Sequence, residues 1–367
     1  MLFFFSISIY TYIISLLFNH RKRKTENYFV RNKIYLDDAV VILSTIFIYM
    51  LLTAFRGLSV GNDTLSYFYQ FNNIQLYGIG IHPEIEIGYK YLEFLFGKYI
   101  SNNYYIFQIF VSLLIYIPMI RLLDRYSNDV SLSCLLFFFI LFSFNINASR
   151  QAIALSIVFY AFYEFALNGK FLLFFFTIIF AALFHRIAIV AIIFPIFTKI
   201  NLNKKRVLVI LVVSIVLASI NAVTESLRRL GLTSKYISLE TGISSFFNLS
   251  LSIILFILFV LYSKSKKQKD LPSLNQFKIW NFYYWMAIMS LCTSILGFDL
   301  EIMPRVTIMF NSFYIFSIPN MMYFVKISRK IRSFIATIFL ILFSVYISGK
   351  LIFRPEWVTE YSYRFFF

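Results

Sequence analysis

The sequence has little charge and few of the residues that interrupt helices. Charged residues make up 14% of the 367 positions, against about 25% in an ordinary soluble protein. There are only 11 Gly and 7 Pro, while hydrophobic residues reach 60% and the mean hydropathy is +0.77. A soluble globule could not cover that much apolar surface, and a disordered chain would not carry it. The composition therefore predicts an all-α polytopic membrane protein.

Several motifs that carry chemistry are also missing. The two cysteines, Cys134 and Cys292, lie in apolar segments and have neither the number of a disulfide framework nor the spacing of a metal site. The sequence has no G-x-x-x-x-G-K phosphate loop, no H-E-x-x-H, no G-x-S-x-G and no Asp-x-Asp pair. These absences disfavour ATP-driven export and transfer from a cytosolic nucleotide sugar, and we expect no metal and no cofactor.

The net charge of +17 comes from 34 Lys and Arg against 17 Asp and Glu. Many of the basic residues stand in short clusters between apolar runs, such as residues 21–24 and 264–267. This pattern is typical of cytoplasmic loops under the positive-inside rule. It indicates a lipid bilayer as the partner of the basic residues and disfavours nucleic acid.

The apolar runs predict about twelve membrane passes (range 10–13) in one membrane domain, 1–367. The segments are 2–18, 39–55, 104–120, 131–147, 151–167, 171–184, 187–198, 207–223, 245–262, 280–297, 306–325 and 333–349. The first has no basic residues before it and no cleavage site after it, so we expect a retained span with its N-terminus outside.

The pair 171–184 and 187–198 is ambiguous, because both segments are short and His185-Arg186 divides them. Counted as two passes, they place nearly twice as many Lys and Arg inside as outside; counted as one pass, they make the two sides about equal. We therefore favour a break at His185-Arg186, formed by a pair of spans or by two half-helices. Both termini, the loop 56–103 and the tail 350–367 then lie outside.

This topology gathers the ionisable residues at the ends of apolar segments on the outer face. They are Arg56, Asp63, Arg150, His185, Arg186, Asp299, Glu301 and Arg305. Within the loop 56–103, the stretch from Glu84 to Ile100 has apolar residues at helical spacing, which predicts an amphipathic helix lying in the membrane interface.

Arg150 and Gln151 follow Asn145 and Asn147 between two apolar runs. The fork of donors on an arginine suits phosphate oxygens, although an arginine at the end of a span can also extend to the lipid headgroups. Each other candidate also has a structural alternative: a helix break for His185, a local ion pair for Arg56 with Asp63, and headgroup contact for Arg305. Glu84, Glu86 and Glu93 could act as a base toward a hydroxyl or form a solvated face.

Six sequence features together resemble the EpsG-like polymerases, which are Wzy-type polymerases of bacterial O-antigen, capsule and exopolysaccharide. Arg56-Gly-Leu-Ser-Val-Gly-Asn-Asp63 with Tyr67 is similar to R-G-x(n)-G-x-D…Y, and Glu86-Ile-Gly88-Tyr to E-x-G-[FY]. Residues 145–151 with Ala154 resemble N-x-x-R-Q-x-x-A, and Ala181 to His185 resemble A-x-x-F-H. Arg305 and the aromatic tail also fit. The chain departs from the family pattern at Asn62 and Arg186.

The resemblance implies a membrane-embedded, GT-C-like glycosyltransferase in the bacterial inner membrane with its active face outside. Its substrates would be undecaprenyl-pyrophosphate-linked oligosaccharide repeats, and a flippase and a chain-length regulator protein would be possible partners. We expect the pyrophosphate to be bound by Arg150, Arg305 and Arg56. Gln151 and Arg186 would contact the substrate, and His185 would contact a phosphate or a hydroxyl. Glu86 or Asp63 would be the base.

Three other functions remain open from the sequence. A flippase or exporter of lipid-linked saccharides would also need many spans and a cationic cavity. An O-antigen ligase-like transferase would use the same donor with another acceptor. A membrane acyltransferase would use His185, which lacks a nearby partner aspartate in the sequence.

Overall fold

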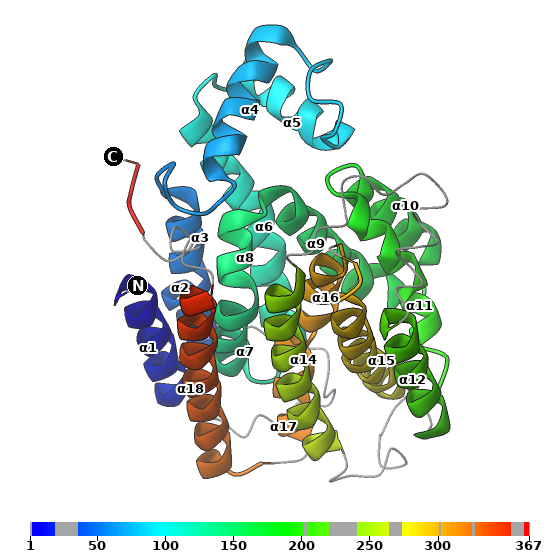
Figure 1. The fold of residues 1–367 in the computed structure, drawn as a ribbon. Helices are drawn as coiled ribbons and strands as arrows, with labels where there is room; N and C mark the ends of the chain where they lie inside the picture. Colours follow the sequence, from blue (N-terminus) through cyan, green and yellow to red (C-terminus); the bar gives the residue numbers. More distant parts are fainter. Residues whose placement is uncertain are drawn as a thin grey trace. The chain divides into compact units, whose positions relative to one another are not determined.

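The computed structural model describes residues 2–18, 36–201, 204–219, 241–263, 274–300, 302–324, 327–353 and 363–366. Within these ranges the chain is helical and forms no β-sheet, which confirms the all-α prediction (Figure 1). The basic clusters at 21–24 and 264–267, Glu301 and most of the tail lie outside the described residues. The Cα positions group into two compact units, residues 1–195 with 328–367 and residues 196–327. A single membrane domain stays a prediction.

The first unit contains most of the helices. They are α1 (Leu2–Leu17), α2 (Leu36–Ser44), α3 (Ile46–Ala54), α4 (Thr64–Tyr77), α5 (Ile87–Tyr99), α6 (Tyr104–Tyr126), α7 (Val130–Phe137), the π-helix η1 (Phe138–Phe142), α8 (Ser143–Asn147), α9 (Ser149–Ala161), the π-helix η2 (Phe162–Ala166), α10 (Phe171–Ala182), the 3-10 helix η3 (Arg186–Ile193) and α18 (Arg329–Phe353). The short α11 (Phe194–Phe197) lies at the boundary between the units.

The second unit contains α12 (Lys204–Ser219), α14 (Thr241–Ser263), α15 (Leu274–Leu296), α16 (Met303–Asn311) and α17 (Tyr314–Phe324). Helix α15 packs against α12, α14 and α16. Buried polar side chains join these helices: Ser252 contacts Ser294 at 2.7 Å, and the Asn281 amide donates to the Ile200 carbonyl at 2.7 Å. Arg305 is exposed in the first turn of α16, after Pro304.

Five apolar helical segments of the described chain are long enough to cross a membrane. They are Leu36–Ala54, Tyr104–Tyr126, Val130–Asn147, Phe277–Leu296 and Arg329–Gly349. The 23 residues of α6 alone rise about 35 Å, more than the roughly 30 Å of a bilayer's hydrocarbon core. The chain is therefore a membrane protein. The count of twelve passes and the GT-C-like fold stay predictions.

The middle of the first unit is a series of helices that run back and forth between two ends. At one end, Gln108 near the start of α6 donates to the carbonyl of Arg56 at 2.9 Å. At the other end, Arg125 near the end of α6 donates to Glu164 of η2 at 2.8 Å. From that second end, α7 and α8 lead back to the first end, where Arg150 lies at the start of α9. Helices α9 and η2 then run to the second end again. Helix α10 returns once more and ends at Ala182, three residues before His185.

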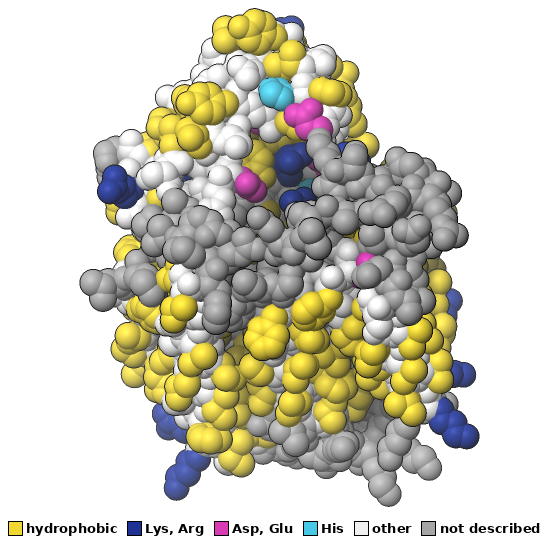
Figure 2. Space-filling model, viewed as in Figure 1, with side chains coloured by type: hydrophobic (Ala, Val, Ile, Leu, Met, Phe, Trp, Pro, Cys, Tyr) yellow, Lys and Arg dark blue, Asp and Glu magenta, His cyan; other side chains and the backbone are white. Residues whose placement is uncertain are grey.

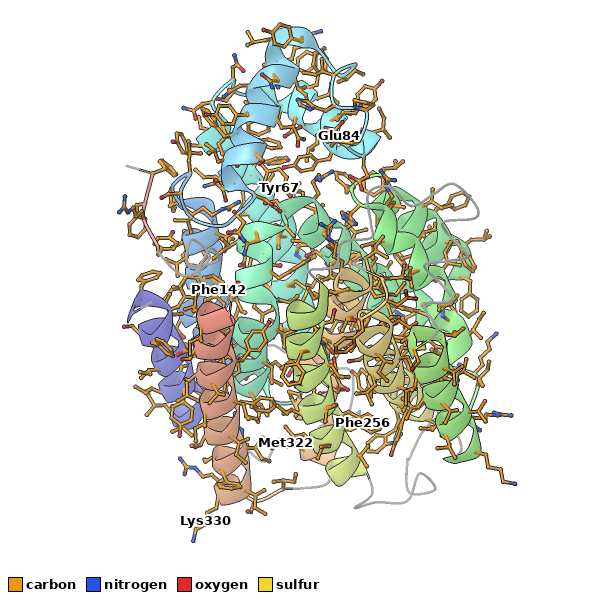
Figure 3. All side chains as sticks on the ribbon, viewed as in Figure 1. Tyr67, Glu84, Phe142, Phe256, Met322 and Lys330 are labelled. Carbon is orange, nitrogen blue, oxygen red and sulfur yellow. The ribbon has the colours of Figure 1, made fainter. Side chains whose placement is uncertain are left out.

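This path places the break at His185-Arg186 at the same end of the unit as the loop 56–103. The opposite end holds Arg121, Arg125, Arg329, Lys330 and Arg332, which match the predicted inner loops. Figure 3 shows the separation, with Lys330 at one end and Tyr67 and Glu84 at the other. The positions favour a turn at His185-Arg186 between two oppositely directed segments.

The loop 56–103 forms a helical hairpin of α4 and α5 beyond the end of α6 (Figure 1). The sequence predicted α5 but not α4. The predicted apolar face of α5 is buried at Ile85, Tyr89 and Phe96, whereas Tyr99 is exposed. That face packs against α4 and α6, which are elements of the protein itself. The position of α5 in a membrane interface stays a prediction.

The C-terminal residues pair with the end of α3. The Gly57 amide donates to the Arg364 carbonyl at 2.7 Å, and the Phe366 amide donates to the Phe55 carbonyl at 3.2 Å. A Cβ at position 57 would lie 3.1 Å from the Phe365 carbonyl oxygen, so the glycine allows this close approach. The chain end therefore lies beside the start of the outer loop.

Candidate functional site

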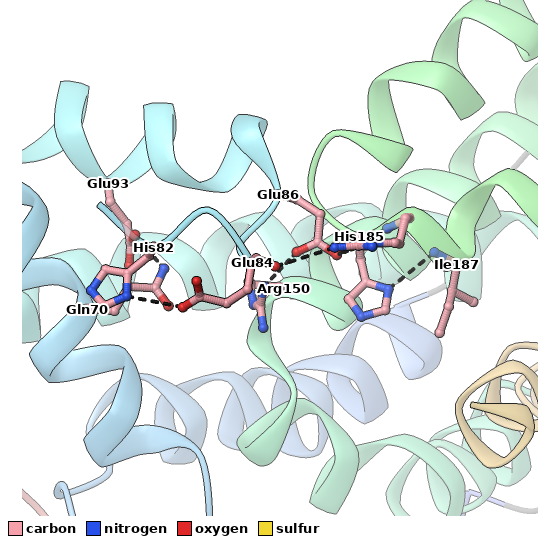
Figure 4. Close-up of polar contacts among 9 residues, drawn as sticks. Gln70, His82, Glu84, Glu86, Glu93, Arg150, His185 and Ile187 are labelled. Carbon is pink, nitrogen blue, oxygen red and sulfur yellow. Dashed lines mark hydrogen bonds and ion pairs between the residues drawn. The ribbon is translucent and has the colours of Figure 1, made fainter. Parts of the chain in front are cut away.

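Three segments that are distant in the sequence meet at the outer-loop end of the first unit. They are the residues that lead into α5, the start of α9, and the break between α10 and η3 (Figure 4). Figure 2 shows acidic and basic side chains set into a hollow below α4 and α5.

The shortest of these contacts joins Glu86 and Arg150. The Arg150 Nη1 atom donates to Glu86 Oε2 at 2.6 Å, and the two side chains are 25% and 10% exposed, respectively. Glu86 lies in extended conformation just before α5, and Arg150 lies in the first turn of α9. A charge-assisted hydrogen bond of this length between half-buried groups fixes both side chains.

Arg186 approaches the same carboxylate from the break before η3. Its backbone amide donates to Glu86 Oε1 at 3.4 Å, and its Nε atom lies 3.7 Å from that oxygen. The Arg186 side chain is 63% exposed, and its Nη2 donates to the Glu84 carbonyl at 3.4 Å. One carboxylate thus lies between two guanidinium groups, which leaves one positive charge in excess and makes the cluster able to attract an anion.

Arg150 also interacts with Tyr67 of α4. Burial raises the pKa of the Tyr67 phenol, and the positive charge of Arg150 and a hydrogen bond from it oppose this rise. The Arg150 Nε atom is enclosed and has no hydrogen-bond partner among the described residues. Because an unmade hydrogen bond of a charged group is costly, this N–H favours an additional acceptor.

Gly88, in the first turn of α5, allows the start of this helix to dock against the end of α10. Its amide donates to the Leu183 carbonyl at 2.9 Å. A Cβ at position 88 would lie 2.7 Å from both the Cβ and the carbonyl oxygen of Leu183. No larger residue fits there without moving backbone, and the contact brings Glu86 to Arg186.

Gly61 allows a second docking contact, between the start of the outer loop and the end of α8. Its φ of +83° is a conformation that favours glycine, and a Cβ there would lie 2.9 Å from Asn147 Oδ1. That oxygen accepts a hydrogen bond from the Asn62 amide at 2.7 Å. Asn147, three residues before Arg150, thus holds the loop that leads to α4.

Arg56 is 1% exposed, and its guanidinium is held by neutral acceptors. It donates to the Thr53 carbonyl at 2.5 Å, to Thr64 Oγ1 at 3.1 Å and to Ser149 Oγ at 3.3 Å. These bonds join α3, α4 and α9 beside Arg150. The geometry supports a structural role, and contact with pyrophosphate stays a prediction.

His185 forms the break that the sequence indicated. It is extended, buried, and its Nδ1 accepts a hydrogen bond from the Ile187 amide at 3.4 Å, which caps η3. Gln151 is buried next to Arg150. Asp63 is exposed at the start of α4, and its charge acts on the pKa of Tyr67. The structure thus places Glu86, Arg150, Arg186 and His185 together.

Arg305 belongs to the second unit, so its predicted part in the same site stays a prediction. Tyr67, Gly61 and Gly88 stand in the motifs that suggested the resemblance, but sequence reasoning gave them no role at the site. Their spacing could have drawn attention to them, whereas their contacts required the fold.

Glu93 is a further ionisable group, for which the sequence left open a base or a residue of a solvated face. It is fully buried in α5, accepts a hydrogen bond from the Gln70 amide at 2.7 Å, and its Oε1 has no partner among the described residues. Burial raises the pKa of the Glu93 carboxyl to about 8, against the opposing effects of Gln70 and Arg150. The group is therefore largely protonated at neutral pH.

The described residues include no cluster of three His, Cys, Asp or Glu side chains suited to a metal ion. The expectation of a metal-independent and cofactor-free reaction stays a prediction.

Comparison with known proteins gives one match. The family model described as the EpsG family matches residues 39–365. No curated protein and no solved structure matches the chain significantly.

Proposed function

The chain belongs to the EpsG family, whose members have a membrane polysaccharide polymerase or glycosyltransferase-like role, and we propose that it joins lipid-linked oligosaccharide repeats into a polymer. The substrates would be undecaprenyl-pyrophosphate-linked repeats at the outer face of a bacterial inner membrane. The product would be O-antigen, capsule or exopolysaccharide. A flippase would deliver the repeats, and a chain-length regulator could act beside the enzyme.

The single observation that carries this proposal is the meeting of Arg150 and Arg186 around Glu86 at one end of a membrane-spanning unit. In the reaction, a hydroxyl of the acceptor sugar attacks the anomeric carbon of the donor, and the bond from that carbon to the pyrophosphate oxygen breaks. The leaving group carries two or three negative charges. Guanidinium groups placed where this charge develops lower the barrier.

Each residue then has a defined part. Arg150 binds a phosphate oxygen through its unpartnered Nε–H, and Arg186 reaches the same group from the exposed side. Glu86 holds both arginines in place, and Glu86 and Asp63 are the bases that the sequence alone suggests. We keep Arg305 as a further pyrophosphate ligand, His185 as a group near the phosphate or hydroxyl, and Gln151 as a substrate contact.

The test compares Arg150→Ala with Arg121→Ala in the natural host. Arg121 is a matched control because it is a 58% exposed arginine at the opposite end of the same unit. We expect Arg150→Ala to abolish long polymer and leave single repeats on the surface acceptor, at unchanged protein level. Arg121→Ala should give normal chains.

The conservative change gives a second measurement. Arg150→Lys should also be poor, because an ammonium group cannot reproduce a bidentate fork. Chains of normal length from Arg150→Ala would refute the proposed site. In a deletion strain, a surface without any attached repeat would indicate a flippase or a ligase instead of a polymerase.

A further inference from the structure

His82 has an unusual backbone conformation in the loop between α4 and α5. Its φ is 61°, and it is the single non-glycine residue with positive φ in the described part of the chain. Pro83 follows it. Residues held in such conformations cost energy and cluster at functional sites, because the surrounding structure must impose them.

The side chain of His82 forms a pair with Glu84. The Nδ1 atom lies 3.2 Å from Glu84 Oε1, and the two side chains are 29% and 48% exposed, respectively. Because a carboxylate accepts hydrogen bonds, the neutral tautomer that fits this contact carries its proton on Nδ1 and has its lone pair on Nε2. Nε2 is enclosed and has no hydrogen-bond partner among the described residues.

This pair lies next to the arginine cluster, which consists of Arg150, Arg186 and Glu86. The backbone carbonyl of Glu84 accepts a hydrogen bond from Arg186 Nη2 at 3.4 Å, and Arg186 in turn contacts Glu86. An unbroken series of contacts therefore leads from Arg150 through Glu86, Arg186 and Glu84 to His82, and Figure 4 shows the Arg150–Glu86 and His82–Glu84 pairs.

The two carboxyl oxygens of Glu86 are already engaged. Oε2 accepts from Arg150 at 2.6 Å and Oε1 accepts from the Arg186 amide. A carboxylate whose oxygens bind two cationic residues is a weaker acceptor for the proton of a sugar hydroxyl. A histidine whose Nδ1–H is held by a carboxylate has the arrangement of a general base, with Nε2 as the acceptor atom.

We propose that His82, oriented by Glu84, is the general base for the transfer; this rests on the proposed function. The acceptor hydroxyl donates its proton to His82 Nε2 while its oxygen forms the bond to the anomeric carbon. The bond from that carbon to pyrophosphate breaks, and the electron pair leaves on the undecaprenyl pyrophosphate. Glu84 stabilises the resulting imidazolium, and Glu86 keeps its place between the arginines.

The test uses full-length protein in lipid nanodiscs and the lipid-linked repeat extracted from a strain that lacks this gene. The variants are His82→Gly and His82→Asn, because glycine and asparagine tolerate positive φ and so keep the loop while they remove the imidazole. Gly80→Ala is the control in the same loop, since a Cβ there meets nothing within 4 Å.

We expect His82→Gly and His82→Asn to join repeats about 10²–10⁴-fold more slowly than the wild type, with unchanged donor binding. Added imidazole should restore activity to His82→Gly, and a series of substituted imidazoles should restore more as their basicity rises. A structural role would not respond to the basicity of the added compound. Glu84→Gln should be slowed by a smaller factor, and Gly80→Ala should match the wild type.

Two results would overturn the assignment: joining by His82→Gly or His82→Asn within threefold of the wild-type rate, or a loss that no imidazole restores. Failure of the proposed function would appear differently. In that case the wild-type protein itself would not join the extracted repeats.

Discussion

Replacement of Gly88 by alanine should move Glu86 away from Arg186 while every side chain of the arginine cluster stays chemically unchanged. The added Cβ would lie 2.7 Å from Leu183 Cβ, 2.7 Å from the Leu183 carbonyl oxygen and 2.9 Å from the carbonyl carbon. Two of these three atoms belong to the backbone, so rotation of a side chain cannot relieve the overlap. The start of α5 must move away from the end of α10.

The size of the effect follows from the contacts that depend on this approach. Overpacking of a close contact typically costs about 1–3 kcal/mol. The hydrogen bond from the Gly88 amide to the Leu183 carbonyl would lengthen, and Glu86, two residues earlier, would shift relative to Arg186. A displacement of about 1 Å at a catalytic site can cost about 10²-fold in rate. We therefore expect a folded protein with severely reduced polymerisation.

The assay is the chain-length distribution of the surface polysaccharide, together with the thermal stability of the purified protein. Gly80→Ala is again the matched control, because its Cβ enters open space. The double variant Gly88→Ala, Leu183→Gly removes only one of the three close contacts, so it should restore little of the lost polymerisation. Wild-type chains from Gly88→Ala would show that the cluster does not depend on this docking contact.

Two further predictions concern the outer loop. Gly61→Ala should cost more stability than Gly78→Ala, since both positions have positive φ but only the Gly61 Cβ would meet another residue; the comparison of melting temperatures checks this. For Glu93, the folded-state pKa of about 8 lies above its ordinary value of 4.5, so stability should fall as pH rises from 4.5 to about 8. Glu93→Gln should flatten the melting temperature across that range, and an unchanged slope would contradict the assignment.

The helical architecture could be predicted because apolar runs of span length leave few alternatives in a membrane. Every predicted segment coincides with helix where the structure describes it. The details inside those helices could not be predicted. The break at Thr45 between α2 and α3, and the π-helices that begin at Phe138 and Phe162, occur in sequence that carries no proline or glycine to mark them.

The site was only partly predictable, and for a physical reason. Arg150 stood out because a charged residue at the edge of an apolar run is costly and needs a partner, and Glu86 because a carboxylate in the outer loop could act as a base toward a hydroxyl. Their pairing across 64 positions depends on how α5 docks against α10, which no local pattern encodes. For Arg56, the same sequence argument suggested a contact with a ligand. In the structure its guanidinium instead donates hydrogen bonds to Thr53, Thr64 and Ser149.

The charge of the cluster also predicts which anion it prefers. Glu86 lies between Arg150 and Arg186 and cancels one of their two charges, so these three residues together keep a single positive charge and two guanidinium forks. A pyrophosphate can engage both forks with separate phosphate groups, whereas a monophosphate of the same lipid can engage only one of them at full strength.

Undecaprenyl pyrophosphate should therefore inhibit repeat joining at concentrations about 10- to 150-fold lower than undecaprenyl phosphate, because one additional charge-assisted contact is worth about 1.5–3 kcal/mol. Arg186→Ala should remove most of this difference while leaving Arg150 paired with Glu86. Both lipids carry the same tail, so the comparison isolates the headgroup. Equal inhibition of the wild-type protein by the two lipids would mean that the arginines do not hold the leaving group.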